Sequence, residues 1–158
     1  MNYTLRKATL ADIQQLTQLF ELYRKFYKQE ADAVAAQNFL SERISKQESV
    51  IFVAENEADE LLGFTQLYPL FSSTKMQRLW LLNDLYVKQE ARGKGLSKKL
   101  IEEAKQLCRE TKASGLMLET AKDNTVGNNL YPATGFQLDT DHNYYFWSAN
   151  QVGFCTLG

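Results

Sequence analysis

The sequence contains few of the residues that build metal centres or activated nucleophiles. Its 158 residues include one histidine, His142, and two cysteines, Cys108 and Cys155. A metal site with several histidine ligands is therefore impossible, and two cysteines so far apart do not make a structural zinc site. A histidine-activated serine or cysteine would have to use His142, which lies in a polar run typical of a surface turn. We expect no bound metal ion.

Long apolar runs and an excess of charge of one sign are also absent. The longest apolar runs are far shorter than the ~20 residues of a membrane span, and the first residues lack the apolar core of a signal peptide. The 18 basic and 19 acidic residues give a net charge of −1, which favours neither nucleic acid nor an anionic membrane. Two cysteines are too few for a disulfide framework, and Cys108 is predicted on a buried helix face. We therefore expect a cytoplasmic protein with no nucleic-acid or membrane partner.

What is present is typical of one globular domain spanning residues 1–158, with 44% hydrophobic and 23% charged residues. Apolar periodicity predicts helices over residues 13–27, 33–45, 96–112 and about 124–131. It predicts strands over residues 3–8, 50–54, 61–70, 76–87 and 116–120, and a final antiparallel pair over 136–138 and 144–147. The expected fold is a mixed α/β sheet of six to seven strands with helices on both faces, in the order β-α-α-β-β-β-α-β-α-β-β.

The chain is organised around a glycine-rich turn at residues 92–97, Arg-Gly-Lys-Gly-Leu-Ser, between a predicted strand and a predicted helix. Gly93 and Gly95 allow the backbone to approach a ligand closely, and the first helical turn offers unpaired N–H groups. These groups and the positive end of the helix dipole favour an anion. Basic side chains surround the same turn: Arg92, Lys94, Lys98 and Lys99. The turn therefore predicts a site for a phosphate-bearing ligand.

Other interpretations of this turn differ in the spacing they require. The turn could simply connect a strand to a helix beside a solvated lysine face, and it would then bind no ligand. A P-loop is a second alternative, but the residue spacing that it requires is absent. A dinucleotide-binding turn needs a small residue where Lys98 stands, and its first glycine follows the strand directly. Here five residues separate Val87 from Gly93, although Glu119 lies where a ribose-binding acid would be expected. Among the functions that we consider for this chain, we therefore rank a dinucleotide-dependent oxidoreductase third.

Two motifs of this sequence, in their order along the chain, resemble those of the GNAT superfamily of acetyl-coenzyme A dependent N-acetyltransferases. The first is the glycine turn, and the second is a pattern carried by Asn124, Gly127, Leu130, Tyr131, Gly135 and Phe136. Residues 82–87, Leu-Asn-Asp-Leu-Tyr-Val, are similar to the equivalent stretch of diamine (spermidine/spermine) N-acetyltransferases. The resemblance implies direct attack of a primary amine on the thioester of acetyl-coenzyme A, without a covalent enzyme intermediate.

The resemblance also implies which residues hold the cofactor. The pyrophosphate would lie against the backbone of the turn, the pantetheine arm would pair with the preceding strand, and two residues near the second motif would contact the arm. These cofactor-binding residues are Leu85, Tyr86, Val87, Arg92, Gly93, Lys94, Gly95, Leu96, Ser97, Asn124 and Tyr131.

Tyr131 and Asp84 are the candidate catalytic residues. The pKa of tyrosine, about 10, lies near that of an alkyl thiol, so Tyr131 is suited to protonate the leaving sulfur. Asp84 is the acceptor-side candidate, either binding the amine or taking its proton, directly or through water, and Glu119 is a weaker alternative. The alternative for Asp84 is a strand-edge carboxylate paired with Arg78 or a lysine.

The expected acceptor is a small polyamine-like molecule or, second, a protein amine. Tyr23, Phe26 and Tyr27 would help to wall its site, although an aromatic helical stripe is more often plain core. Family members are often dimers, so a homodimer is compatible with the resemblance. The rival interpretation is a non-catalytic acyl-coenzyme A binding or regulatory module. It stays open because three residues depart from the pattern: Asn83, Ser97 and Pro132.

Overall fold

The structure is a computed structural model that describes residues 2–150. The chain divides into two compact units, Met1–Asn124 and Thr125–Gly158. The first unit contains one five-stranded sheet in the order β1-β2-β3-β4-β5. Its strands are β1 (Tyr3–Lys7), β2 (Val50–Asn56), β3 (Leu61–Ser72), β4 (Gln77–Val87) and β5 (Leu116–Met117). Neighbouring strands are antiparallel except β4 and β5, which are parallel as the strand–helix–strand order predicts.

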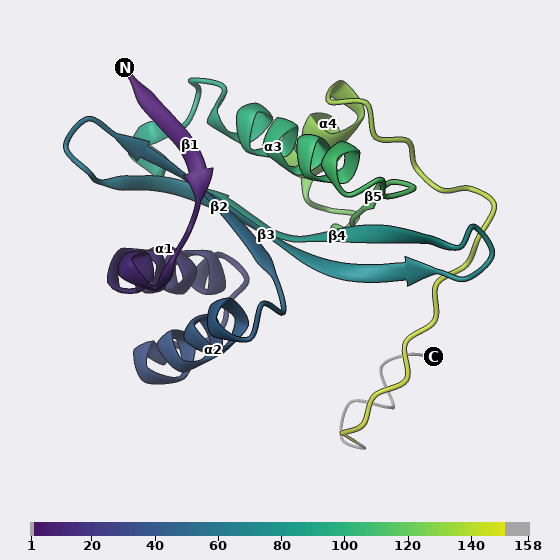
Figure 1. Cartoon of the computed structure of the whole chain (residues 1–158), viewed down its shortest axis with the longest axis horizontal. Helices are drawn as coiled ribbons and strands as arrows, with labels where there is room; N and C mark the ends of the chain where they lie inside the picture. Colours follow the sequence, from purple (N-terminus) through teal and green to yellow (C-terminus); the bar gives the residue numbers. More distant parts are fainter. Residues whose placement is uncertain (1, 151–158) are drawn as a thin grey trace. The chain divides into compact units, whose positions relative to one another are not determined.

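Helices of the first unit cover both faces of this sheet, as predicted. Helices α1 (Ile13–Phe26) and α2 (Ala33–Ser45) lie on one face, and α3 (Leu96–Glu110) lies on the other (Figure 1). Asp32 caps α2 by accepting a hydrogen bond from the Ala35 amide at 3.1 Å. Within residues 2–150, no helix combines the length and the apolar character needed to cross a membrane.

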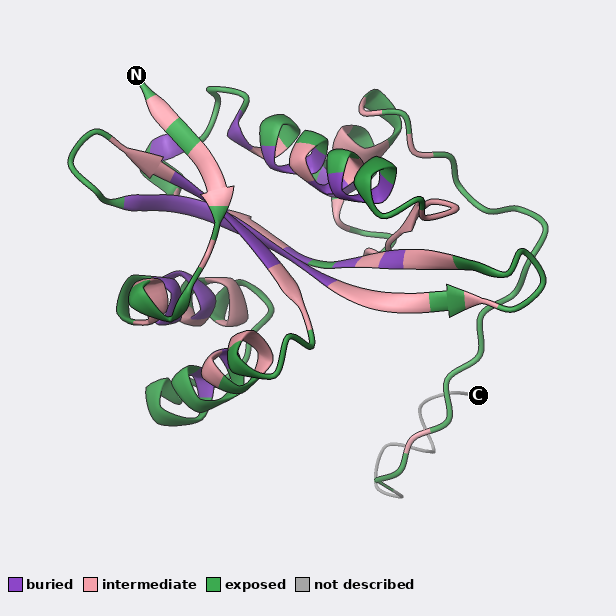
Figure 2. Ribbon diagram, in the orientation of Figure 1, coloured by how far each residue is buried: buried purple, intermediate pink, exposed green. Residues whose placement is uncertain are grey.

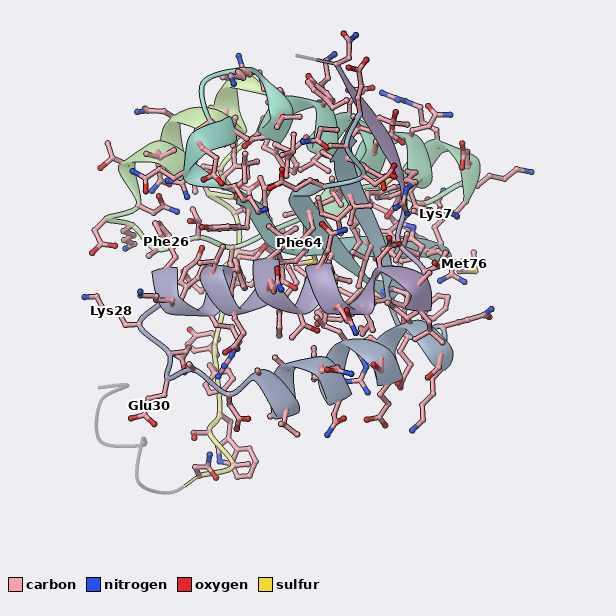
Figure 3. All side chains as sticks on the ribbon, turned by 90° about the vertical axis from the view of Figure 1, so that its left-hand side faces the viewer. Lys7, Phe26, Lys28, Glu30, Phe64 and Met76 are labelled. Atoms are coloured by element: carbon pink, nitrogen blue, oxygen red, sulfur yellow. The ribbon has the colours of Figure 1, made fainter. Side chains whose placement is uncertain are left out.

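The core on the α1 side forms where the apolar stripe of α1 meets β2 and β3. Leu16 and Leu19 of α1 are fully buried, as are Val53 of β2 and Phe64 of β3. Figure 2 shows this burial in the central strands, and Figure 3 labels Phe64 where β3 lies over α1. The predicted stripe of α1 is therefore confirmed, and it fixes the helix against the middle of the sheet.

The pairing of β4 with β3 is irregular at one position, near the end of β4 that leads to the glycine-rich turn. Gln66 pairs with Asp84, whereas the next residue of β3, Leu67, pairs with Leu82. Asn83 is therefore an extra residue in β4, which makes a β-bulge that bends the strand locally. Asn83 is exposed while Leu82 and Asp84 are buried.

Strands β4 and β5 separate just before this bulge. Their pairing consists of Trp80 with Leu116 and Leu81 with Met117. From Leu82 to Val87, β4 pairs with β3 alone among the described residues. The predicted strand 116–120 is therefore correct in position and too long, and its last residues leave the sheet.

The prediction of six to seven strands is wrong. Residues 136–138 and 144–147 are described, and neither segment forms a strand. Between them, the Asp139 carboxylate accepts hydrogen bonds from the amides of Asp141 and His142 and makes a local turn. Aromatic residues favour a strand only where a partner supplies hydrogen bonds and a surface to pack on. Neither segment makes a backbone–backbone ladder within residues 2–150, so composition alone misled the prediction.

Three smaller predictions have clear outcomes. His142 lies in an exposed turn, as expected. Cys108 is a buried free thiol on α3, and burial raises its pKa, whereas Cys155 lies outside the described residues. The second unit contains α4 (Thr125–Ala133), which ends one residue after Pro132, as the missing proline N–H leads one to expect.

Candidate active site

The glycine-rich turn has the backbone geometry of an anion site. Gly93 and Gly95 have φ angles of 78° and 79°, in the left-handed region that favours glycine. Gly95 is the N-cap of α3, and no side chain caps the helix. Among the described residues, no acceptor bonds the backbone N–H groups of residues 93–98. Consecutive N–H groups at the positive end of a 15-residue helix suit a phosphate.

Arg92 connects this turn to the end of β4. Its Nε donates to the Val87 carbonyl at 2.9 Å, and its guanidinium lies over the Tyr86 ring, 5.5 Å from the centroid. The side chain therefore fixes the path from the strand to the glycines. Lys99, one turn into α3, lies 5.0 Å from the ring centroid of Tyr3.

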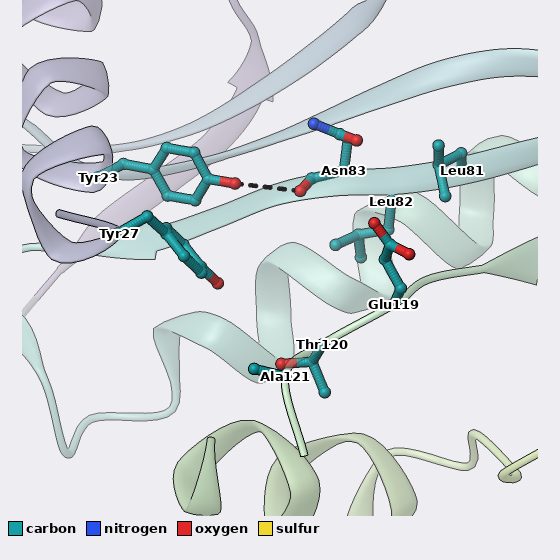
Figure 4. A pocket seen from close by; sticks show the side chains of 8 residues that line it. All are labelled: Tyr23, Tyr27, Leu81, Leu82, Asn83, Glu119, Thr120 and Ala121. Atoms are coloured by element: carbon teal, nitrogen blue, oxygen red, sulfur yellow. Dashed lines mark hydrogen bonds between the residues drawn. The ribbon is translucent and has the colours of Figure 1, made fainter. Parts of the chain in front are cut away.

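A pocket of about 420 Å³ opens beside the β4 bulge (Figure 4). Two tyrosines at the C-terminal end of α1 form one side, β4 forms the floor, and the segment after β5 forms the other side. The lining residues are Tyr23, Tyr27, Leu81, Leu82, Asn83, Glu119, Thr120 and Ala121. The Tyr23 hydroxyl points at β4 and donates to the Asn83 carbonyl at 3.2 Å. The pocket thus combines aromatic rings, a backbone carbonyl and one carboxylate, groups that attract a cation.

Asp84 lies behind this pocket rather than in its lining. Its side chain is buried, with 3% of the residue exposed. One carboxylate oxygen accepts from Nε2 of Gln66 and the other from Nδ2 of Asn83, the latter at 2.9 Å. Arg78 lies over the rings of Phe71 and Trp80. The side-chain amides of Gln66 and Asn83 therefore hold the Asp84 carboxylate, and the arginine weighed from the sequence does not pair with it.

The surroundings of Asp84 change the proton affinity of several groups. Burial raises the pKa of Asp84, and hydrogen bonds from Gln66, Tyr23 and Asn83 oppose that rise. Burial and then the Asp84 charge raise the pKa of Tyr27. The same two causes, in the same order, raise the pKa of Tyr68. Such shifts around one carboxylate beside a pocket are typical of functional sites.

The two candidates from the second motif lie in different units. Asn124 ends the first unit, where its Nδ2 donates to the Thr120 hydroxyl at 2.9 Å. Tyr131 lies on α4 in the second unit, and its ring packs edge-on against Phe136 at 5.7 Å between centroids. Their role in binding or catalysis stays a prediction.

Sequence reasoning did not find the residues that hold Asp84. Gln66 is fully buried, and its carbonyl accepts from the Ser49 hydroxyl at 2.8 Å, which turns its amide nitrogen toward Asp84. A glutamine at an inward position of an apolar strand was the available signal. Tyr23 was predicted as a wall of the acceptor site, and its hydrogen bond to β4 was not predicted.

Comparison with known proteins decides the family. Residues 14–136 match the family described as Acetyltransferase (GNAT) family. The chain belongs to the GNAT family. An uncharacterized N-acetyltransferase of Bacillus subtilis, YhfO, is 41% identical over 141 residues, which cover 89% of this chain and 94% of that protein. A probable acetyltransferase of Haemophilus influenzae is 33% identical and covers 84% of this chain and 89% of its own length.

A solved structure agrees with this GNAT assignment. The crystal structure of a probable acetyltransferase matches with a TM-score of 0.88 and 38% identity, covering 96% of this chain and 99% of that one. The chain is thus an acetyltransferase of the GNAT family, whose members generally use acetyl-coenzyme A. Within the described residues, no group of three histidine, cysteine, aspartate or glutamate side chains is placed to hold a metal ion.

Proposed function

We propose that this GNAT acetyltransferase transfers an acetyl group from acetyl-coenzyme A to a primary amine of a small cationic molecule. The observation that carries the proposal is the course of β4. Its residues Leu81 to Asn83 line the pocket, and the strand then leads to the glycine turn. One strand edge therefore joins a cation-attracting pocket to an anion-binding turn. A donor with a phosphate group at one end and a thioester at the other fits this arrangement.

The residues along this path fit acetyl-coenzyme A. The backbone N–H groups of residues 93–98, which have no acceptor in the described part of the chain, would hold the pyrophosphate. Within residues 2–150, Leu85 to Val87 have no partner strand on the β5 side, and they would pair with the amide groups of the pantetheine arm, as an added strand does. When bound, acetyl-coenzyme A supplies the activated acetyl group. Asn124 and Tyr131 remain candidates for contacts to the arm.

The pocket favours an acceptor with positive charge. Glu119 places a carboxylate opposite the rings of Tyr23 and Tyr27 (Figure 4). An ammonium group gains from both the carboxylate and the ring faces. A volume of about 420 Å³ suits a short amine such as a diamine or polyamine. A protein amine is the second candidate, entering as a single extended side chain.

Tyr131 is the proposed general acid for the leaving thiolate. In Tyr131→Phe, we expect kcat to fall by about 10²- to 10⁴-fold, because a positioned proton donor is lost. Affinity for acetyl-coenzyme A, measured by calorimetry, should stay within about threefold, since only a hydroxyl is removed. Tyr144→Phe is the matched control, because its hydroxyl donates to Asp139 and has no proposed role.

The assay is thiol release from acetyl-coenzyme A over a panel of diamines, polyamines and lysine-containing peptides. Release with diamines and polyamines supports the proposal, and release with peptides alone selects the protein acceptor. Binding of acetyl-coenzyme A with no release on any amine would instead favour a non-catalytic acyl-coenzyme A binding module. That alternative stays open because three residues depart from the family pattern: Asn83, Ser97 and Pro132.

A further inference from the structure

The pocket beside the β4 bulge has a lining that attracts positive charge. None of the residues that line it is basic. Glu119 supplies a carboxylate on one side, and the rings of Tyr23 and Tyr27 stand on the other (Figure 4). A carboxylate and ring faces both bind cations, and no lysine or arginine of the lining opposes them. The pocket is therefore suited to hold a positively charged group.

The nitrogen that is acetylated does not need such a site. An amine attacks a thioester with its lone pair, so the attacking nitrogen is uncharged when the acceptor is ready to react. The cation-binding groups therefore act on a second basic group of the acceptor, which keeps its proton. Binding energy from a part of the substrate that does not react helps to hold the reacting part in place.

Tyr23 and Tyr27 are exposed to the pocket to different degrees. The Tyr23 hydroxyl donates to the Asn83 carbonyl at 3.2 Å, and its ring packs edge-on against Phe64 at 5.8 Å between centroids. The Tyr27 ring centroid lies 5.0 Å from that of Tyr23, with the two rings inclined by 62°, and 46% of Tyr27 is exposed. Tyr23 therefore supports Tyr27, and Tyr27 offers the ring that a bound acceptor can cover.

A defined helix end holds Tyr27 at the pocket. Tyr27 is the C-cap of α1, and the next residue, Lys28, has a φ of 60° in the left-handed region. The Lys28 amide donates to the Lys25 carbonyl and the Gln29 amide donates to the Arg24 carbonyl, both at 2.9 Å. These two bonds form a Schellman motif, in which glycine is usual at the left-handed position. The chain keeps this motif without a glycine, and α1 ends with the Tyr27 side chain directed into the pocket (Figure 4).

We infer that Tyr27 is a specificity-determining residue, which selects acceptors that carry two basic groups. Its ring face and the Glu119 carboxylate bind the group that stays charged, while the other nitrogen is acetylated. The inference rests on the proposed amine acetylation. In the part of the chain that the structure describes, the Tyr27 hydroxyl makes no hydrogen bond, so the selectivity belongs to the ring and not to the hydroxyl.

The test measures thiol release with matched pairs of amines. Each diamine in a series of chain lengths is paired with the monoamine in which a methyl group replaces the distal ammonium, as pentylamine does for diaminobutane. The two members of a pair have equal numbers of heavy atoms and differ in one charge. At equal concentrations of the unprotonated reacting nitrogen, the best diamine should have a kcat/KM about tenfold or more above that of its monoamine. The difference should lie mainly in KM.

Variants of the full chain separate the ring from the hydroxyl and from the carboxylate. Tyr27→Phe keeps the ring, so the diamine-to-monoamine ratio of kcat/KM should stay within about twofold of the wild type. Tyr27→Leu removes the ring, and the ratio should fall by about fivefold or more through a higher KM for the diamine. Glu119→Gln should lower the ratio as well. Phe71→Leu is the matched control, because it removes an exposed ring of β3 that does not line the pocket, and its ratio should equal that of the wild type.

The ratio separates selectivity from a merely structural role. A change that only loosens the fold lowers both rates and leaves their ratio unchanged, and circular dichroism checks that each variant is folded. Equal kcat/KM for diamines and monoamines in the wild type would overturn the inference. So would an unchanged ratio in Tyr27→Leu, or a ratio in Tyr27→Phe as low as that in Tyr27→Leu. A wild-type chain that releases no thiol with any amine would overturn the proposed function itself, which is a different outcome.

Discussion

The role proposed for Asp84 in activity and its effect on stability act in opposite directions. Its pKa in the folded chain is raised, chiefly by burial, above its value of about 3.9 in an unfolded chain. The folded chain therefore binds a proton at Asp84 more tightly than the unfolded chain does. Its contribution to stability is fully present below the unfolded pKa and is lost as the pH rises through the folded pKa.

Asp84→Asn should consequently be more stable than the wild type at pH 8 and inactive at the same pH. The difference in unfolding midpoint, measured by urea titration, should close as the pH falls toward 4, since the wild-type carboxyl is then neutral. Ser72→Ala, at the end of β3 where the hydroxyl contacts that of Thr74, is the control and should show no such pH trend. A wild type that stays more stable than Asp84→Asn at pH 8 would contradict this argument.

Sequence reasoning at this scale identified Asp84 but not its environment. The position of Asp84 in the strand before the glycine turn was enough to name it. Its partner Gln66 and the Ser49 hydroxyl that orients Gln66 are 18 and 35 residues away in the chain, and Gln66 meets Asp84 only because of the register at the bulge. No local pattern specifies where an extra residue enters a strand, so the burial of Asp84 could not be predicted.

Among the elements, the turn into α3 carries the clearest prediction. In Gly95→Ala, the new Cβ would meet no atom within 4 Å, so the effect comes from the backbone alone. A φ of 79° costs an alanine about 1–2 kcal/mol. We expect the turn to relax and affinity for acetyl-coenzyme A to fall by about tenfold or more, measured by calorimetry.

Gly115→Ala is the matched control for this change. Gly115 also has no atom within 4 Å of an added Cβ, and its φ lies outside the left-handed region. Affinity for acetyl-coenzyme A should therefore be unchanged. Equal losses in both glycine variants would show that the left-handed turn is not what the cofactor needs.

The elements differ in how far the sequence determines them. Helix α2 begins and ends as predicted, because Asp32 caps it and its apolar residues keep a helical spacing. The aromatic run at residues 144–147 has equally clear strand composition and forms no strand. A helix satisfies its own hydrogen bonds, whereas a strand depends on a partner elsewhere in the chain. A strand can therefore be predicted with success only where its partner strand in the sheet can also be identified.

At the scale of the whole molecule, the proposed cofactor residues are divided between the two units, with the glycine turn in the first and Tyr131 in the second. Acetyl-coenzyme A at 100 times its Kd should stabilise the folded chain by about 2.7 kcal/mol. For a chain of this size that corresponds to a rise in Tm of roughly 5–10 °C, measurable by differential scanning fluorimetry. Gly95→Ala should show a smaller rise at the same concentration. A nicotinamide dinucleotide that raises Tm when acetyl-coenzyme A does not would revive the oxidoreductase alternative.

The separation of β4 from β5 also affects the tendency of the protein to aggregate. From Leu82 to Val87, β4 pairs only with β3 among the described residues, and an unpaired strand edge is a template for aggregation. A flat, regular edge would accept almost any extended peptide. The bulge at Asn83 breaks that regularity. The irregularity therefore also limits the regular unpaired edge to the few residues after the bulge, which is too short a stretch for extensive pairing with a foreign strand.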